Sequence, residues 1–151
     1  MKLAEALQER ADLVRKIGEL RGRLDDNATV QEGENPAEDP SVLLSDLRVA
    51  IARLERLTAS VNLTNTHTLL DGKTLTEQLA KRDALRLQIE SLREVIAEGS
   101  RLAKRASHTE IRILSAVDVP VLQKEADTLS AELRKLDNRI QETNWTTEMA
   151  L

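Results

Sequence analysis

A heptad repeat of apolar residues near the C-terminal end constrains the fold of this chain more than any other feature. Its members are spaced alternately by four and three residues: Leu122, Ala126, Leu129, Leu133, Leu136 and Ile140. Residues at this spacing form one stripe along a helix, and another helix buries that stripe. The chain has one tryptophan and no phenylalanine or tyrosine, so aliphatic side chains must build the core. The pattern therefore predicts long amphipathic helices packed as a coiled coil.

Three earlier segments share this helical spacing. Their apolar residues recur three, four or seven positions apart, in the ranges 3–28, 43–64 and 75–96. Local start signals accompany the helical segments. Asp39 directly precedes Pro40, Asp118 lies two residues before Pro120 at the start of the last segment, and Thr74 with Glu77 forms a capping box. We predict a mainly α fold, an antiparallel four-helix bundle.

The helices also match one another in pairs. At an offset of 72 residues, the first segment aligns with the third, including Arg10 with Arg82 and Arg21 with Arg93. At an offset of 79, the second aligns with the fourth, and both end in Thr-Asn. We interpret this as two duplicated helical hairpins, 1–66 and 75–145, within a single domain 1–151. The alternative is that any two heptad helices align tolerably well.

The segments between the helices differ in character. Residues 30–40 combine a glycine, two prolines and four acids, which predicts a loop. Residues 109–119 alternate β-branched and apolar residues with polar ones, as a short strand does. We therefore expect a small β ribbon in which 109–117 pairs with 29–31.

Charge and cysteine content limit the partners and the compartment. The net charge is −4, and the basic residues are interspersed with acids, so no basic face is available for nucleic acid. There is no cysteine, which excludes disulfides, zinc–thiolate sites and thiol catalysis, and fits a reducing compartment. The first residues are charged, and no apolar run approaches about 18 residues. We expect a cytoplasmic protein with neither a nucleic-acid nor a membrane partner.

One short motif resembles part of a phosphate-binding loop. Gly72, Lys73 and Thr74 precede a predicted helix, as in the end of a P-loop, where backbone N–H groups and a lysine hold phosphates. The full motif requires a glycine five residues earlier, and His67 occupies that position. A turn followed by a helix cap explains the same residues, and we predict no cofactor.

Two weak candidates for a metal site lie between the helices. His67 and His108 are the only histidines, and Asp71 and Glu110 are near them in sequence. No paired histidine spacing occurs on a helix, so solvated loop histidines are the alternative. The acidic loop could offer carboxylate oxygens to a hard cation, but its residues lack the EF-hand spacing. These residues are Glu32, Glu34, Glu38 and Asp39.

Trp145 and Asn144 are the candidates for an interaction site. A lone tryptophan outside the heptad can anchor a partner, and it can equally pack on its own chain or on a symmetry mate. We predict that these two residues contribute to an interface.

Several longer segments together resemble a known family. They are 1–13, 27–40, 71–76 and 140–148. The resemblance covers nearly the whole chain and is to small uncharacterised bacterial proteins sometimes labelled septicolysin. That label implies kinship with cholesterol-dependent pore-forming toxins, which are longer, β-rich and secreted, with a tryptophan-rich membrane loop. The resemblance supplies no catalytic residues.

Taken together, these patterns predict a non-enzymatic structural or protein-interaction protein that forms a homo-oligomer; they identify no other protein partner. A first alternative is a phosphate- or metal-binding protein whose site lies in the interhelical loops. A second is membrane activity through the amphipathic helices, which the scarcity of aromatic residues on their apolar sides disfavours.

Overall fold

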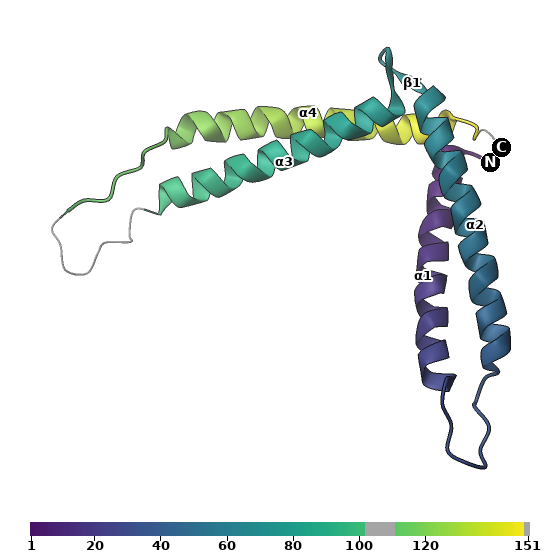
Figure 1. Ribbon diagram of the computed structural model, residues 1–151. Helices are drawn as coiled ribbons and strands as arrows, with labels where there is room; N and C mark the ends of the chain where they lie inside the picture. The colour runs from purple at the N-terminus through teal and green to yellow at the C-terminus, as the bar shows by residue number, and fades with distance from the viewer. Residues whose placement is uncertain (102–110, 150–151) are drawn as a thin grey trace. The chain divides into compact units, whose positions relative to one another are not determined.

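The computed structural model describes residues 1–101 and 111–149, and Figure 1 shows its elements. They are α1 (Leu3–Asn27), α2 (Pro40–His67), β1 (Leu69–Leu70), β2 (Lys73–Thr74), α3 (Leu75–Ser100) and α4 (Val119–Thr146). The predicted mainly α class and its helical hairpins are confirmed. Contacts divide the chain into two compact units, Met1–Thr68 with Glu142–Leu151 and Leu69–Gln141, and each is described by itself.

In the first unit, α1 and α2 form an antiparallel hairpin. Its core contains three buried residues with partly buried ones packed against them: Leu20, Leu43 and Ala50, then Leu13, Ile17, Leu24 and Leu47. Glu9 near the start of α1 accepts two hydrogen bonds from Arg53 in α2, at 2.6 and 2.8 Å. The aliphatic stripe predicted from the sequence therefore forms the contact between these two helices.

The connection between α1 and α2 is held by one buried asparagine. Asn27 is only 8% exposed, and its Nδ2 donates to the carbonyl oxygen of Arg23 at 2.8 Å. Its Oδ1 accepts from the backbone N–H of Glu38 at 2.9 Å. Asp39 then caps α2 by accepting from the N–H of Ser41, with Pro40 as the first helical residue. The helix start predicted at Asp39 is confirmed.

Residues from both ends of the chain meet in the first unit. Lys2 and Glu148 form an isolated antiparallel bridge. The N–H of Leu3 donates to the carbonyl oxygen of Thr147 at 2.9 Å, and the N–H of Met149 donates to that of Met1 at 3.0 Å. The C-terminal residues thus satisfy a backbone donor at the start of α1 that has no partner within the helix.

The second unit contains a small β hairpin and the helices α3 and α4. The strands β1 and β2 pair antiparallel, Leu69 with Thr74 and Leu70 with Lys73. Between them Asp71 and Gly72 both have positive φ, 56° and 76°, which is the backbone twist of a tight two-residue hairpin turn. The amide of buried Gln78 donates to the carbonyl oxygen of Leu70 at 2.8 Å and ties the hairpin to α3.

The predicted position of the β ribbon is wrong. Residues 29–31 and 111–117 contain no strand, whereas 109 and 110 lie outside the described residues. Alternation alone does not make a strand, because a strand also requires a neighbour with which to form backbone hydrogen bonds. Ile111 and Leu114 are instead about three-quarters exposed. The ribbon forms where Asp71-Gly72 closes the shortest possible loop.

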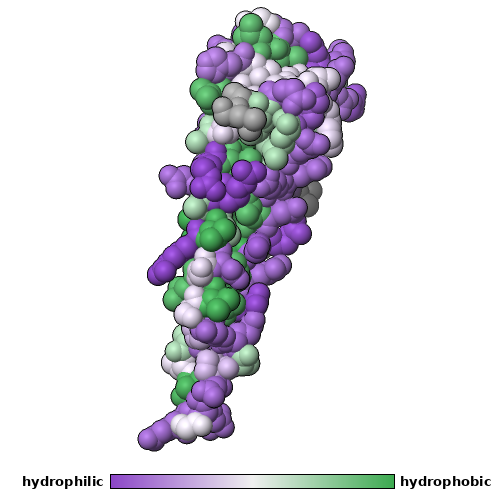
Figure 2. Space-filling model, turned by 90° about the vertical axis from the view of Figure 1, so that its right-hand side faces the viewer, coloured by the Kyte–Doolittle hydropathy of each residue, from purple (hydrophilic) through white to green (hydrophobic). Residues whose placement is uncertain are grey.

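Exposed apolar side chains on α2 do not form one large patch. In Figure 2, which shows the side of the molecule at the right of Figure 1, hydrophobic side chains stand in separate small groups among hydrophilic ones. Val42, Val49, Ile51 and Leu63 are among the exposed residues of this helix. Single exposed apolar residues are ordinary on a protein surface. Among the described residues, no helix is both long and apolar enough to cross a membrane.

Candidate functional site

The Gly72-Lys73-Thr74 motif forms a turn, a strand and a helix cap. The hydroxyl of Thr74 accepts from the N–H of Glu77 at 3.2 Å, and the Glu77 carboxylate accepts from the N–H of Thr74 at 2.7 Å. The Glu77 carboxylate accepts hydrogen bonds from the N–H and the hydroxyl of Thr74, and these hold the pKa of Glu77 below its ordinary value. The predicted capping box is confirmed, and it already uses two backbone groups at the start of α3.

A basic pocket surrounds the exposed side of this turn. It has a volume of about 320 Å³ and is lined by Asp71, Lys73, Gln78, Lys81, Glu132, Lys135, Leu136 and Arg139. Four of these side chains are positive and two are negative. Arg139 pairs with Asp71, and Lys81 pairs with Glu132 at 2.6 Å. We call this set of residues the basic pocket.

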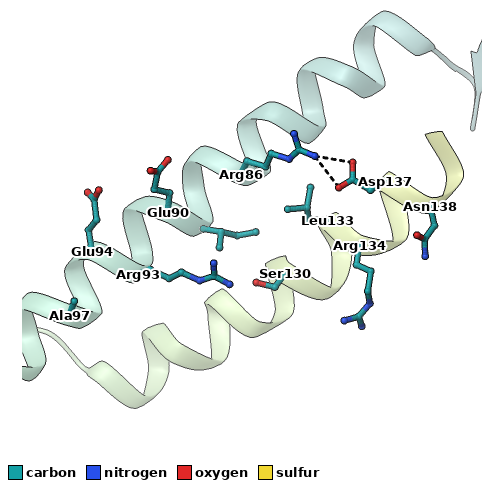
Figure 3. A pocket seen from close by; sticks show the side chains of 11 residues that line it. Arg86, Glu90, Arg93, Glu94, Ala97, Ser130, Leu133, Arg134, Asp137 and Asn138 are labelled. Atoms are coloured by element: carbon teal, nitrogen blue, oxygen red, sulfur yellow. Dashed lines mark hydrogen bonds and ion pairs between the residues drawn. The ribbon is translucent and has the colours of Figure 1, made fainter. Parts of the chain in front are cut away.

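An open groove of about 900 Å³ runs along the α3–α4 hairpin. It is lined by Arg86, Ile89, Glu90, Arg93, Glu94, Ala97, Ser130, Leu133, Arg134, Asp137 and Asn138. Figure 3 shows Leu133 turned toward α3 and Arg93 turned toward α4, with Glu90 and Glu94 on the side of α3 away from α4. Arg86 bridges the helices to Asp137 at 3.2 Å. The groove therefore combines an apolar floor with charged edges.

The metal candidates are not brought together within the described residues. His67 is the last residue of α2, and its Nδ1 lies 2.8 Å from the carbonyl oxygen of Leu63. His108 and Glu110 lie outside the described residues. Across 1–101 and 111–149, no group of three or more histidine and acidic side chains is arranged to hold a metal ion.

The acidic loop uses part of its charge within the chain. Glu38 pairs with Arg23, and Asp39 accepts from both the N–H and the hydroxyl of Ser41. These contacts lower the pKa of both carboxyl groups. Glu32 and Glu34 are exposed. Two of the four candidate cation ligands, Glu38 and Asp39, thus have structural roles.

Trp145 and Asn144 lie side by side in sequence but differ in burial. Asn144 is 7% exposed, whereas Trp145 is 52% exposed. An indole that is half in water can cover apolar surface of a partner while its N–H remains hydrated. Both residues therefore stay predicted interaction residues, with Trp145 as the exposed member of the pair and Asn144 as the buried one.

The described carboxyl groups with shifted pKa values are all stabilised in the charged form. Each described carboxyl group with a resolved shift has a lowered pKa, namely Glu9, Glu38, Asp39, Glu77 and Glu148. Each is held in the charged form by a cation, a hydroxyl or a backbone N–H.

Sequence reasoning missed most of the basic pocket and the whole groove. Lys81, Lys135 and Arg139 are separated by up to 58 positions, and only the packing of α4 against α3 brings them near Lys73. One signal was available, because Lys135 and Arg139 are four residues apart and therefore share a helix face.

The fold and these surfaces define a class of small, mainly α proteins built from helical hairpins. A family model described as a family of unknown function (DUF6847) matches residues 10–149, and the chain belongs to this family. A similar solved structure is described as a functionally unknown conserved protein from Corynebacterium diphtheriae. It is 36% identical, covers 99% of each chain and has a TM-score of 0.93. No curated protein matches this chain. Neither description carries the septicolysin label or names an activity.

Proposed function

We propose that this chain is a non-enzymatic helical protein that self-associates, using the α3–α4 groove as its main contact surface. The observation that carries the proposal is the incomplete burial of the heptad stripe on this hairpin. Ala126, Leu136 and Ile140 are buried, whereas Leu129 and Leu133 are only partly covered. A coiled-coil stripe gains its full stabilisation only when further helices cover it.

The α3 side of the groove shows the same gradient. Ile89 is buried, whereas Leu92 and Ile96 are partly exposed. The groove edges carry three arginines and three carboxylates, so the surface has no net charge to repel another copy. An apolar floor with charged edges is the usual anatomy of a protein interface. A helical segment of matching character fits this surface.

The compartment and the other partner classes belong to the same proposal. We place self-association in the cytoplasm. The chain has no cysteine, so it has no disulfide that a reducing environment could break. The excess of acids, 26 against 22 basic residues, supports a protein rather than a nucleic-acid partner. The septicolysin label would instead imply membrane activity, which a liposome leakage assay tests directly.

Size-exclusion chromatography with light scattering tests the proposal. We expect the wild-type chain to exceed the monomer mass at micromolar concentration. Leu133→Lys should shift it toward the monomer, because a lysine at the groove floor loses apolar contact and adds charge. Val49→Lys is the matched control, since Val49 is 67% exposed on α2 and lies outside the groove. Circular dichroism should show that both variants remain helical.

Two results would count against this proposal. A wild-type chain that remains strictly monomeric would contradict self-association. A folded Leu133→Lys variant with the same mass as the wild-type oligomer would show that the copies meet elsewhere. In that case Trp145→Ala becomes the informative variant, because Trp145 is the exposed aromatic residue of the first unit.

A further inference from the structure

We infer that the basic pocket beside the β1–β2 turn binds a phosphate dianion, either free or as the phosphate group of a small phosphate monoester. Three elements supply its cations: β2 carries Lys73, α3 carries Lys81, and α4 carries Lys135 and Arg139. This site is separate from the α3–α4 groove and does not depend on self-association.

The charges of the pocket are not balanced by the protein. Asp71 neutralises Arg139, and Glu132 neutralises Lys81. Within the described residues, neither Lys73 nor Lys135 has a carboxylate oxygen within 4 Å of its ammonium nitrogen. The eight lining residues therefore carry an excess of two positive charges in a chain whose net charge is −4. Of the carboxylates outside this set, that of Glu77 acts on Lys73, which lowers the pKa of Glu77 in addition to the larger effect of the hydrogen bonds from Thr74, and it offsets part of this excess.

This excess is mildly destabilising without an anion. Lys135 and Arg139 are four residues apart on one helix, a spacing at which like charges destabilise the helix. The packing of α3 and the turn then adds Lys73 and Lys81 to the same place. A phosphate group carries about −1.5 to −2 charges near neutral pH and three strong acceptor oxygens. It complements the excess in both sign and amount.

The scaffold around the pocket is positioned before any ligand arrives. Gln78 ties β1 to α3 through the carbonyl oxygen of Leu70. The capping box fixes Thr74, the residue after Lys73. The ion pair between Asp71 and Arg139 joins the turn to α4. Positioned donors on regular elements reduce the entropy lost when an anion is bound.

The size of the pocket limits the ligand. A volume of about 320 Å³ lies at the lower end of the range of small-molecule sites, roughly 300–1,000 Å³. Inorganic phosphate or a short phosphate monoester fits this space. The resemblance of Gly72-Lys73-Thr74 to a P-loop is incomplete, because His67 stands where the motif requires glycine. The expected ligand therefore carries a single phosphate group and is not a nucleoside triphosphate.

Isothermal titration calorimetry on the full chain tests the inference, with inorganic phosphate and glycerol phosphate titrated separately at constant ionic strength. We expect saturable binding of at least one of them. Lys73→Gln and Lys135→Gln should each weaken it roughly tenfold, because each removes a charge-assisted hydrogen bond. Lys135→Arg should retain binding. Lys16→Gln, at an exposed position on α1, is the matched control and should bind as the wild type does.

The outcomes separate the sources of the ligand and can overturn the inference. Binding of inorganic phosphate alone assigns the pocket to free phosphate, and tighter binding of the ester assigns it to a phosphorylated small molecule. Absence of saturable binding for both anions overturns the inference. Equal affinity in the wild type, Lys73→Gln and Lys135→Gln also overturns it, provided that circular dichroism shows the variants to be folded. None of these results depends on the oligomeric state.

Discussion

Asn27 offers the sharpest test of how the first hairpin is held together. Replacement by alanine removes two hydrogen bonds, one donated to the carbonyl oxygen of Arg23 and one accepted from the N–H of Glu38. Each is worth about 0.5–1.5 kcal/mol, and the loss includes the cost of leaving a partly buried N–H unpaired. We expect Asn27→Ala to lower the free energy of unfolding by about 2 kcal/mol. For a chain of this length, that corresponds to a fall in Tm of roughly 4–8 °C.

Urea denaturation followed by circular dichroism measures this loss. Asn35→Ala is the matched control, because Asn35 is an exposed residue of the same loop and its replacement should stay within about 0.5 kcal/mol of the wild type. Asn27→Asp keeps the acceptor but removes the donor, so it should fall between the two. Equal unfolding midpoints for Asn27→Ala and Asn35→Ala would refute the assignment of a structural role to the buried amide.

Three further predictions concern the turn, the helix cap and the ion pair. Gly72 has φ of 76° and open space where a Cβ would lie, so Gly72→Ala should lower the free energy of unfolding by about 1 kcal/mol from backbone conformation alone. Gly18→Ala in helix α1 should instead raise it by about 0.5–1 kcal/mol. Thermal melts in which both variants shift Tm in the same direction would contradict this. Thr74→Ala should cost about 1 kcal/mol by removing the cap of α3, and Thr74→Ser should restore most of it in the same melts. Because Arg53 lowers the pKa of Glu9, the pair contributes stability above the unfolded pKa of about 4.3 that is lost as pH falls through the folded value. Urea titrations should therefore show Glu9→Gln less stable than the wild type at neutral pH, and a difference that persisted unchanged well below pH 4 would argue against the pair as its source.

Local signals in the sequence predicted the helices well. Asp39 before Pro40 and Thr74 before Glu77 act within a few residues of themselves, and the structure confirms both as helix caps. The aliphatic spacing likewise predicted which stripe of each helix is buried. Such features depend on the chain over one or two turns, so they can be inferred without knowledge of the rest of the fold.

Features that depend on distant residues could not be predicted in this way. The alternation in 111–117 indicated a strand, but a strand forms only where a partner strand is available, and 29–31 does not provide one. The basic pocket depends on the register of α4 against α3, which places Lys135 beside a turn more than 60 residues away. The structural role of Asn27 could likewise not be predicted, because it depends on a hydrogen bond from the N–H of Glu38, which the fold brings near it.

The bridge between Lys2 and Glu148 has a consequence for the order in which the chain folds during synthesis. The second unit is one continuous segment, Leu69–Gln141, so all of its contacts become available as soon as that segment leaves the ribosome. The first unit also needs Glu142–Leu151, and the hydrogen bond from Leu3 to Thr147 spans 144 positions. Domains generally fold in the order in which they are synthesised. The hairpin of α1 and α2 has its own core, but the N–H of Leu3 gains its partner only after Thr147 has been synthesised. The unit that begins first is therefore the one completed last.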